Sequence, residues 1–210
     1  AARLDAPAPG ALLGVAADAR PLDQPTLSGD SAKVGDVAIP ADRPAVTADA
    51  AASPWQTVTL PVGDALHAIW GSGASDLWAV GNNGAVIHFD GQTWSKEPAL
   101  TGRDLRGVWG TGGEVWVVGV IGTVLRRTTT WTQVTVPTTV NLSGVWGASP
   151  KDLWVTGRSG ALFHYDGSTW TATTQGTTDL NGIWGSAADD VWVVGDGGTL
   201  LHYDGSAWKK

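Results

Sequence analysis

The 210-residue sequence contains no cysteine and no methionine. Without thiols, the chain forms neither disulfides nor the thiolate-ligated metal sites typical of structural zinc. Cysteine-free chains occur both inside and outside the cytoplasm, so this absence does not assign a compartment. The lack of an initiator methionine predicts that the chain is processed or excerpted.

The sequence also has no long apolar run and no basic stripe. No stretch approaches the ~18 apolar residues of a membrane-spanning helix, and no signal peptide remains. The formal net charge is −7, and the acidic residues are spread along the chain. A distributed negative charge disfavours nucleic acid and anionic membranes as partners. We therefore expect no nucleic-acid partner and no membrane span.

Residues 1–54 contain no aromatic residue, although they hold seven of the eleven prolines. Such a composition buries too little surface to offset the conformational entropy of the chain. Residues 1–54 are therefore predicted to be an Ala/Pro-rich linker or arm that is disordered in isolation. Every Trp, Tyr and Phe lies in residues 55–210, which are expected to form the globular part.

Three series of tryptophans repeat with a period of about 38 residues within 55–210. The first series is Trp70, Trp109, Trp146 and Trp184, with spacings of 39, 37 and 38 residues. The second is Trp78, Trp116, Trp154 and Trp192, with a constant spacing of 38 residues. The third is Trp94, Trp131, Trp170 and Trp208, with spacings of 37, 39 and 38 residues. A period this steady indicates one supersecondary unit stacked on copies of itself. The units are placed at 66–98, 105–137, 142–177 and 180–210.

Each unit is predicted to hold four short antiparallel strands, called a to d in chain order. Segments of four to six residues rich in Val, Ile, Trp, Tyr and Thr alternate with Gly, Asp, Asn or Ser, and none shows helical spacing. Asn83-Gly84 and Asp90-Gly91 are typical of the b–c and c–d hairpin turns. Asp76 and its equivalents precede strand b, where an acid is expected to cap a turn amide.

Strand b, for example Asp190-Val-Trp-Val-Val-Gly195, is apolar at successive positions. A strand with this pattern is covered on both faces. Radially packed blades cover both faces of every sheet. The fold class predicted is therefore all-β: a β-propeller of four-stranded antiparallel blades, with four repeats of about 38 residues.

The segment 55–61 resembles strand d of the second unit, because Trp55-Gln56-Thr57-Val58 matches Trp131-Thr132-Gln133-Val134. This d strand is expected to complete the last blade and close a four-bladed ring, which removes an exposed sheet edge. Trp55 and Trp208 would then compete for one place. Either the last three residues fray, or the ring is larger: two chains form eight blades, or strand donation forms a polymer.

The pattern W-G-x-x-x-x-D-[LV]-W-x-V-G-x-x-G-x-[LV]-x-H-[FY]-D-G-x-x-W covers residues 55–210. It resembles the Trp-rich β-propeller repeats of exported bacterial proteins, and it is similar in style to the repeats of bacterial propeller lectins. Asp90-Gly91, Asp166-Gly167 and Asp204-Gly205 look like a shortened Asp-box, which lacks one residue and the preceding Ser. Asp-boxes are structural turns away from ligand sites, so the resemblance implies no catalytic role.

The histidines of strand c are candidate binding residues: His88, His164 and His202. Three equivalent imidazoles are compatible with a metal site, but equivalent positions lie on different blades and do not converge. We expect each histidine to hydrogen-bond to a neighbouring blade, with Asp76-type acids as candidate partners, and we expect no metal and no cofactor. In the second unit Arg126 and Arg127 interrupt the pattern. That departure marks either a ligand site or drift at a solvated strand edge.

No catalytic arrangement is present in the sequence. Gly157-Arg158-Ser159-Gly160 is not a nucleophile elbow, and Gly195-Asp196-Gly197-Gly198 lacks the strand–turn–helix setting of a dinucleotide loop. The carboxylates are repeated turn residues, so no glycosidase pair stands out. The chain is predicted not to be an enzyme.

Most tryptophans are expected to pack between blades, and the candidates for exposed carbohydrate platforms are Trp94, Trp131 and Trp170. Two functions remain open. The first is a non-catalytic, exported binding module that recognises a glycan or a protein at blade junctions. The second is a structural subunit of a larger extracellular assembly or homo-oligomer, which uses the N-terminal arm and an incomplete last blade. The extracellular location rests on the resemblance and on the Ala/Pro/Asp-rich leader.

Overall fold

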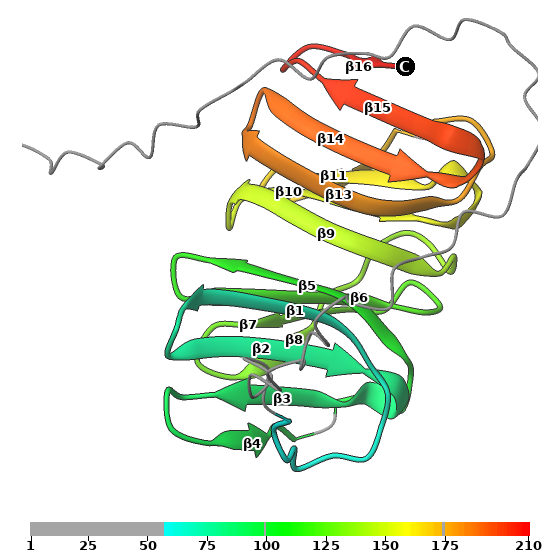
Figure 1. The fold of residues 1–210 in the computed structure, drawn as a ribbon. Coiled ribbons are helices and arrows are strands. Elements are labelled where there is room, and N and C mark those ends of the chain that lie inside the picture. Colours follow the sequence, from blue (N-terminus) through cyan, green and yellow to red (C-terminus); the bar gives the residue numbers. More distant parts are fainter. Residues whose placement is uncertain (1–56, 99, 174) are drawn as a thin grey trace, which may run out of the picture. The chain divides into compact units, whose positions relative to one another are not determined.

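The computed structural model describes residues 57–98, 100–173 and 175–210, and the described part is all-β. Sixteen strands form four separate antiparallel sheets of four strands each, in simple up-and-down order (Figure 1). The chain divides into residues 1–54 and a second unit, 55–210. The expectation of a disordered arm at 1–54 lies outside the described residues.

Each sheet corresponds to one sequence repeat and is called a blade. The strands of the first two blades are β1 (Leu66–Gly73), β2 (Asp76–Gly81), β3 (Val86–Phe89) and β4 (Trp94–Lys96), followed by β5 (Leu105–Thr111), β6 (Glu114–Gly119), β7 (Val124–Arg127) and β8 (Trp131–Gln133). Those of the last two are β9 (Leu142–Ser149), β10 (Asp152–Gly157), β11 (Leu162–Tyr165) and β12 (Trp170–Ala172), followed by β13 (Leu180–Ala187), β14 (Asp190–Gly195), β15 (Thr199–Tyr203) and β16 (Trp208–Lys209). The predicted fold class is confirmed.

The b–c turns have the backbone conformation that their residues predict. Short 3-10 turns η1 (Asn82–Gly84), η2 (Arg158–Gly160) and η3 (Asp196–Gly198) lie between the b and c strands of blades 1, 3 and 4. Asn83 and Gly84 both have positive φ, 55° and 72°. Asn and Gly tolerate this region, so the turn closes the hairpin without strain.

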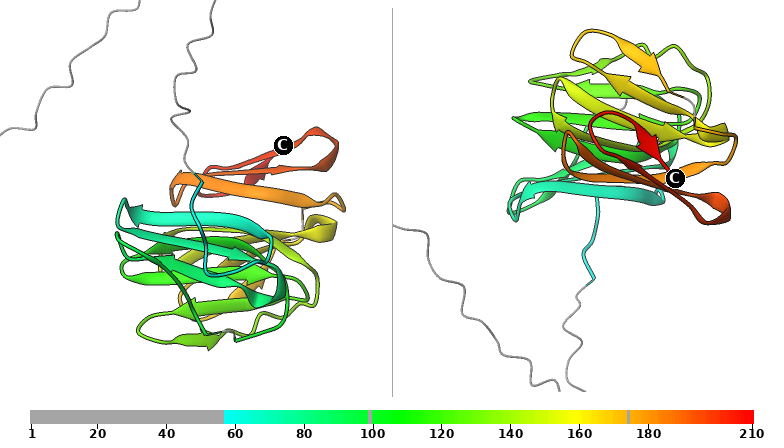
Figure 2. Two further views of the ribbon diagram at one scale, coloured as in Figure 1. Left: turned by 60° about the horizontal axis from the view of Figure 1, so that its bottom comes forward. Right: turned by 90° about the horizontal axis from the view of Figure 1, so that it is seen from above.

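The first strands of the blades are the innermost. β1 packs against β5, β5 against β9, and β9 against β13, and Figure 2 shows these sheets succeeding one another from two further directions. Each hydrophobic cluster joins two neighbouring blades: one joins blades 1 and 2, the next joins blades 2 and 3, and the last joins blades 3 and 4. The core of the molecule is therefore the set of blade junctions.

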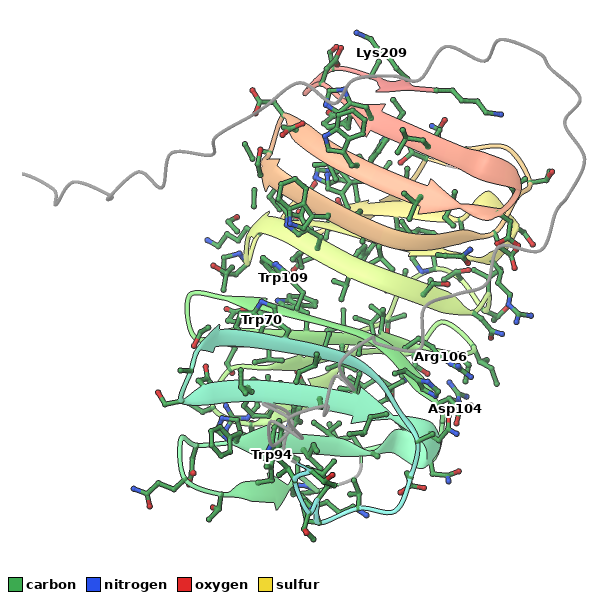
Figure 3. The ribbon with its side chains drawn as sticks, viewed as in Figure 1. Trp70, Trp94, Asp104, Arg106, Trp109 and Lys209 are labelled. Atoms are coloured by element: carbon green, nitrogen blue, oxygen red, sulfur yellow. The ribbon has the colours of Figure 1, made fainter. Side chains whose placement is uncertain are left out.

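A tryptophan of each inner strand fits over a glycine of the next blade. A Cβ atom on Gly110 would lie 2.7 Å from the Trp70 ring, and one on Gly147 would lie 2.9 Å from the Trp109 ring. Figure 3 labels Trp70 and Trp109 along the line of inner strands. The W-G dipeptide thus supplies both the indole and the glycine that receives the preceding blade's indole.

The predicted ring closure through residues 55–61 differs from the structure. Residues 55 and 56 lie outside the described part, and residues 57–61 form no strand. The fourth sheet instead takes β16 as its outer strand, with Trp208 opposite Tyr203. Within the described residues, β13 and β1 make no contact comparable to those between successive inner strands. Each blade is thus completed by its own last strand, and within the described residues the blade series is open between its fourth and first members.

Candidate binding grooves at the blade junctions

An acid, an imidazole and an indole meet at one end of the first blade. Asp76 begins β2, and Trp78 lies two residues later on the same face of the strand. His88 is paired with Trp78 across β2 and β3. Asp76 Oδ1 accepts hydrogen bonds from Trp78 Nε1 at 2.9 Å and from His88 Nε2 at 2.8 Å. The repeat spacing of D-x-W and H is therefore the spacing of one hydrogen-bonded group.

The acid–imidazole pair recurs in the third and fourth blades, and in the fourth Trp192 Nε1 also donates to Asp190 at 2.8 Å. His164 Nε2 lies 2.6 Å from Asp152 Oδ1, and His202 Nε2 lies 2.9 Å from Asp190 Oδ1. The imidazole also stacks on the indole, with ring centroids 4.0 Å apart in the Trp78–His88 pair. The expectation that these histidines bond to a neighbouring blade is wrong: the acid belongs to the same blade, because strands b and c are adjacent in one sheet.

These acids serve side chains instead of the turn amide that the sequence predicts. The Asp76 carboxylate also accepts from the Ser72 hydroxyl at 2.5 Å. Burial raises the pKa of Asp76, but the hydrogen bonds from Ser72, His88 and Trp78 outweigh burial and hold that pKa below its usual value. Asp190 also has a lowered pKa, first through Ser186 and then through Trp192 and His202. The carboxylates thus stay ionised at neutral pH.

The second blade replaces the acid and imidazole with a longer ion pair. Arg126 takes the place of the histidine in β7, and Glu114 takes the place of the aspartate in β6. Two Arg126 nitrogens donate to the two Glu114 carboxylate oxygens, each at 2.8 Å, and this pairing raises the pKa of Arg126. The buried Trp116 Nε1 has no hydrogen-bond partner among the described residues, whereas its counterpart Trp78 Nε1 donates to Asp76. In the second unit, both members of the acid–imidazole pair are therefore replaced together, the aspartate by Glu114 and the histidine by Arg126.

Aromatic and cationic side chains of each blade contact the strand b tryptophan of the preceding blade. The Arg127 guanidinium lies 4.8 Å from the centroid of the Trp78 ring, and Trp131 meets the same ring edge-on at 5.8 Å. Tyr165 and Trp170 contact Trp116 in the same way. Arg127 therefore replaces the tyrosine of the other units as a junction residue.

The three tryptophans expected at an exposed rim are placed differently from one another. Trp131 and Trp170 are half-buried in the junctions, and Trp131 Nε1 donates to Glu97 at 3.0 Å. Trp94 is also half-buried, but the one aromatic ring that it contacts within the described residues is Phe89 of its own blade, with ring centroids 5.3 Å apart. Trp131 and Trp170 thus pack against the preceding blade, whereas within the described residues Trp94 does not.

Grooves open where the a–b and c–d turns of neighbouring blades meet. The groove between blades 3 and 4 has a volume of about 430 Å³ and is lined by Lys151, Asp152, Trp154, His164, Asp166, Asp189 and Tyr203, among others. A counterpart of about 180 Å³ lies between blades 1 and 2, lined by residues that include Asp76, Trp78, His88, Glu114 and Arg127. The structure brings the predicted site residues His164, His88 and Arg127 to these grooves. Trp94, Trp131, Trp170, Arg126 and His202 do not line either groove.

The carboxylates in the larger groove differ in what they bind. Asp152 accepts from His164, and Asp166 accepts the backbone N–H groups of Ser168 and Thr169 at 2.8 and 2.7 Å. These backbone and hydroxyl donors lower the pKa of Asp166 strongly. Asp189 makes no ion pair or side-chain hydrogen bond within the described residues. Asp189 is exposed, so its carboxylate is available to pair with an incoming ligand.

The repeat pattern predicts only a turn-capping role for Asp152 and no role for Asp189 or Lys151. The sequence feature that identifies them as groove residues is their position in the a–b turn, because that turn lies at the same end of the blade as the c–d turn. Within the described residues, no three His, Asp or Glu side chains are grouped so as to hold a metal ion, and no helix is long and apolar enough to cross a membrane.

No protein-family model matches the sequence, and no curated protein sequence does. The fold is similar to solved structures. A structure of YCF48 bound to a D1 peptide matches with a TM-score of 0.52 and 16% identity, over 75% of this chain and 70% of that one. YCF48 from Cyanidioschyzon merolae matches with a TM-score of 0.60 and 19% identity, over 74% of this chain and 58% of that one. At these identities, the likeness shows the propeller fold.

Proposed function

We propose that this chain is a non-catalytic binding module that takes a protein segment carrying a basic side chain into the groove between blades 3 and 4. The observation that carries the proposal is that a carboxylate and aromatic side chains line the same groove. Asp189 offers a carboxylate without a partner among the described residues, beside the aromatic side chains Trp154 and Tyr203. A lysine or arginine side chain matches this surface, since its charge pairs with the acid and its stem packs on the half-buried Tyr203 ring.

Two further points support a protein ligand. The net charge of −7 favours association with a basic partner segment. One structure with a similar fold is that of YCF48 bound to a D1 peptide. The other two carboxylates of the groove are engaged, Asp152 by a histidine and Asp166 by turn amides, which supports a role without catalysis. Export of the chain stays a prediction from the leader composition.

Binding of a labelled peptide library to the full chain tests this function. Peptides that alternate lysine with apolar residues should bind, while the same peptides with glutamate in place of lysine should not. Asp189→Asn should weaken binding about tenfold, the loss expected for one charge-assisted contact of about 1.4 kcal/mol. Asp196→Asn removes the same charge at the opposite end of blade 4 and should leave the affinity unchanged. Equal binding of lysine and glutamate peptides would refute the proposal.

Glycan binding is the second candidate, and the position of Trp94 favours it. Trp94 is the candidate platform that is not packed on a preceding blade within the described residues. A sugar ring stacks on such an indole through its C–H face. A glycan array read with wild type and Trp94→Ala distinguishes the candidates: sugar binding that Trp94→Ala abolishes, without peptide binding, would replace the first proposal. The other predicted ligand residues, Trp131 and Trp170, serve as packed controls.

A further inference from the structure

Among the described residues, nothing covers the apolar face at either end of the blade series. On the fourth blade the exposed side chains are Trp184 (61% exposed), Trp192 (37%), Val194 (51%) and Leu200 (49%). On the first blade Ile69 is 64% exposed, whereas its equivalents Val108 and Val145 are 8% and 7% exposed because the preceding blade covers them. Uncovered apolar patches of this kind mark interaction surfaces.

The uncovered faces carry the two halves of the tryptophan-to-glycine fit. Trp70, Trp109 and Trp146 each fit over a glycine of the next blade: Gly110, Gly147 and Gly185. Trp184 is the equivalent indole of the fourth blade and is largely exposed. Gly71 is the equivalent glycine of the first blade, and no tryptophan ring lies against its Cβ position among the described residues. The fourth blade thus presents the indole and the first blade presents the glycine.

The aromatic contacts that join neighbouring blades also lack their partners at the two ends of the blade series. Trp78, Trp116 and Trp154 each contact a pair of side chains from the following blade, for example Tyr203 and Trp208 at 5.1 Å from Trp154. Trp192 has no following blade, and the one aromatic ring that it contacts within the described residues is His202 of its own blade. Phe89 and Trp94 are the matching pair on the first blade, and within the described residues they contact no aromatic ring but each other.

A polar contact between blades is also unmatched at both ends. The turn amide of Asn83 donates to Asp104 of the next blade at 3.1 Å, and that of Ser159 donates to Asp179 at 2.8 Å. Gly197 occupies the same turn position in the fourth blade, and its amide has no such acceptor among the described residues. Asp64 holds the acceptor position before the first blade, where one of its oxygens accepts from Asn83 Nδ2 at 2.9 Å.

We propose that the exposed face of the fourth blade binds the first blade of a second copy of this chain. The contact repeats the three interior junctions: Trp184 over Gly71, Trp192 against Phe89 and Trp94, and the Gly197 amide on Asp64. Any apolar partner covers Val194 and Leu200, but a blade of this repeat also supplies the glycine, the aromatic pair and the carboxylate in register. A pair of copies that forms the junction twice closes an eight-bladed ring, within the usual range of four to eight blades.

Sedimentation of the full chain, with single lysine or arginine substitutions at the two faces, tests the proposal. Wild type should sediment at twice the 21.7 kDa chain mass. Val194→Lys on the fourth blade and Ile69→Arg on the first should each give a monomer, because each places a charge in the junction. Thr171→Lys, on the exposed outer strand of the third blade, is the matched control and should remain a dimer. Circular dichroism shows whether each variant is folded.

A mixture of the two monomeric variants gives the decisive result. Val194→Lys retains an intact first blade, and Ile69→Arg retains an intact fourth blade, so the mixture should form a heterodimer through one junction. A mixture that stays monomeric would exclude head-to-tail pairing. A folded wild-type chain that stays monomeric when its concentration is raised 100-fold would overturn the closed pair. A ladder of larger assemblies would overturn it as well. The peptide assay on Asp189 is independent, because that groove lies within one copy.

Discussion

At the scale of single residues, the repeat places one carboxylate where three donors converge. Asp76 is the clearest case, since it accepts from a hydroxyl, an indole and an imidazole. Its side chain is 40% exposed, so solvent screens the charge and each interaction contributes little. The group links β1, β2 and β3 of one blade, and it fixes the orientation of Trp78 in the junction.

The lowered pKa of Asp76 predicts a loss of stability in acid. A carboxyl whose pKa is lower in the folded state contributes stability that is complete above its unfolded pKa of about 3.9 and is lost as the pH falls through the folded pKa. The urea midpoint of wild type should therefore fall between pH 5 and pH 2. Asp76→Asn should show a shallower fall, and at pH 6 it should cost less than about 1 kcal/mol.

Ser72→Ala serves as the intermediate case for the acid experiment, because it removes one donor and leaves the carboxylate. Its pH profile should lie between those of wild type and Asp76→Asn. Identical profiles for all three proteins would show that the donors around Asp76 do not lower its pKa.

At the scale of the element, one turn departs from its equivalents. The second residue of the b–c turn is left-handed in every blade, and it is Asn83, Ser159 or Gly197 in three of them. In the second blade it is Ile121, with φ of 54° and 49% exposure. A β-branched residue is strained in this region, and its exposure means that little burial offsets the strain. The turn persists because the Ile121 amide donates to Asn141 of the next blade at 3.0 Å.

Ile121→Asn should therefore stabilise the protein, by about 1 kcal/mol, since asparagine tolerates the left-handed region. Chemical denaturation followed by tryptophan fluorescence measures the gain. Ile121→Val, which stays β-branched, should show no gain. An asparagine variant no more stable than the valine variant would mean that the turn stores no strain.

At the scale of the whole molecule, position in the blade series decides what a repeated residue contributes. Trp116 and Trp192 are equivalent in the repeat, yet Trp116 is fully buried by blade 3 while Trp192 lies on the uncovered face of blade 4. The stability of stacked repeats is close to a sum over neighbouring interfaces. An end blade with one interface is thus expected to open before an interior blade.

Trp116→Ala should lower the free energy of unfolding by about 3–5 kcal/mol, the usual cost of removing a buried indole. Trp192→Ala should cost less than half as much when both are measured by urea denaturation at a concentration where the chain is monomeric. Equal costs would show that something covers the fourth blade within one copy. At concentrations where copies pair, the cost of Trp192→Ala should rise.

The sequence by itself determined the blade. The period of the tryptophans, the D-G and N-G turns and the doubly apolar strand b predict four-stranded sheets covered on both faces, because these signals are local or repeat at one spacing. The sequence pattern predicts that His88 and His164 bond to acids of a neighbouring blade. The acids instead belong to the same blade, because strands b and c are paired within one sheet.

Tertiary structure alone decided how the blade series ends. The match of residues 55–61 to a d strand predicted closure, whereas β16 completes the fourth sheet and leaves Trp184 and Ile69 uncovered. A repeat sequence encodes each junction equally well for a neighbour in the same chain or in another copy, because the contacting residues are the same. The angle between successive blades, which local sequence does not specify, determines whether the last face reaches the first.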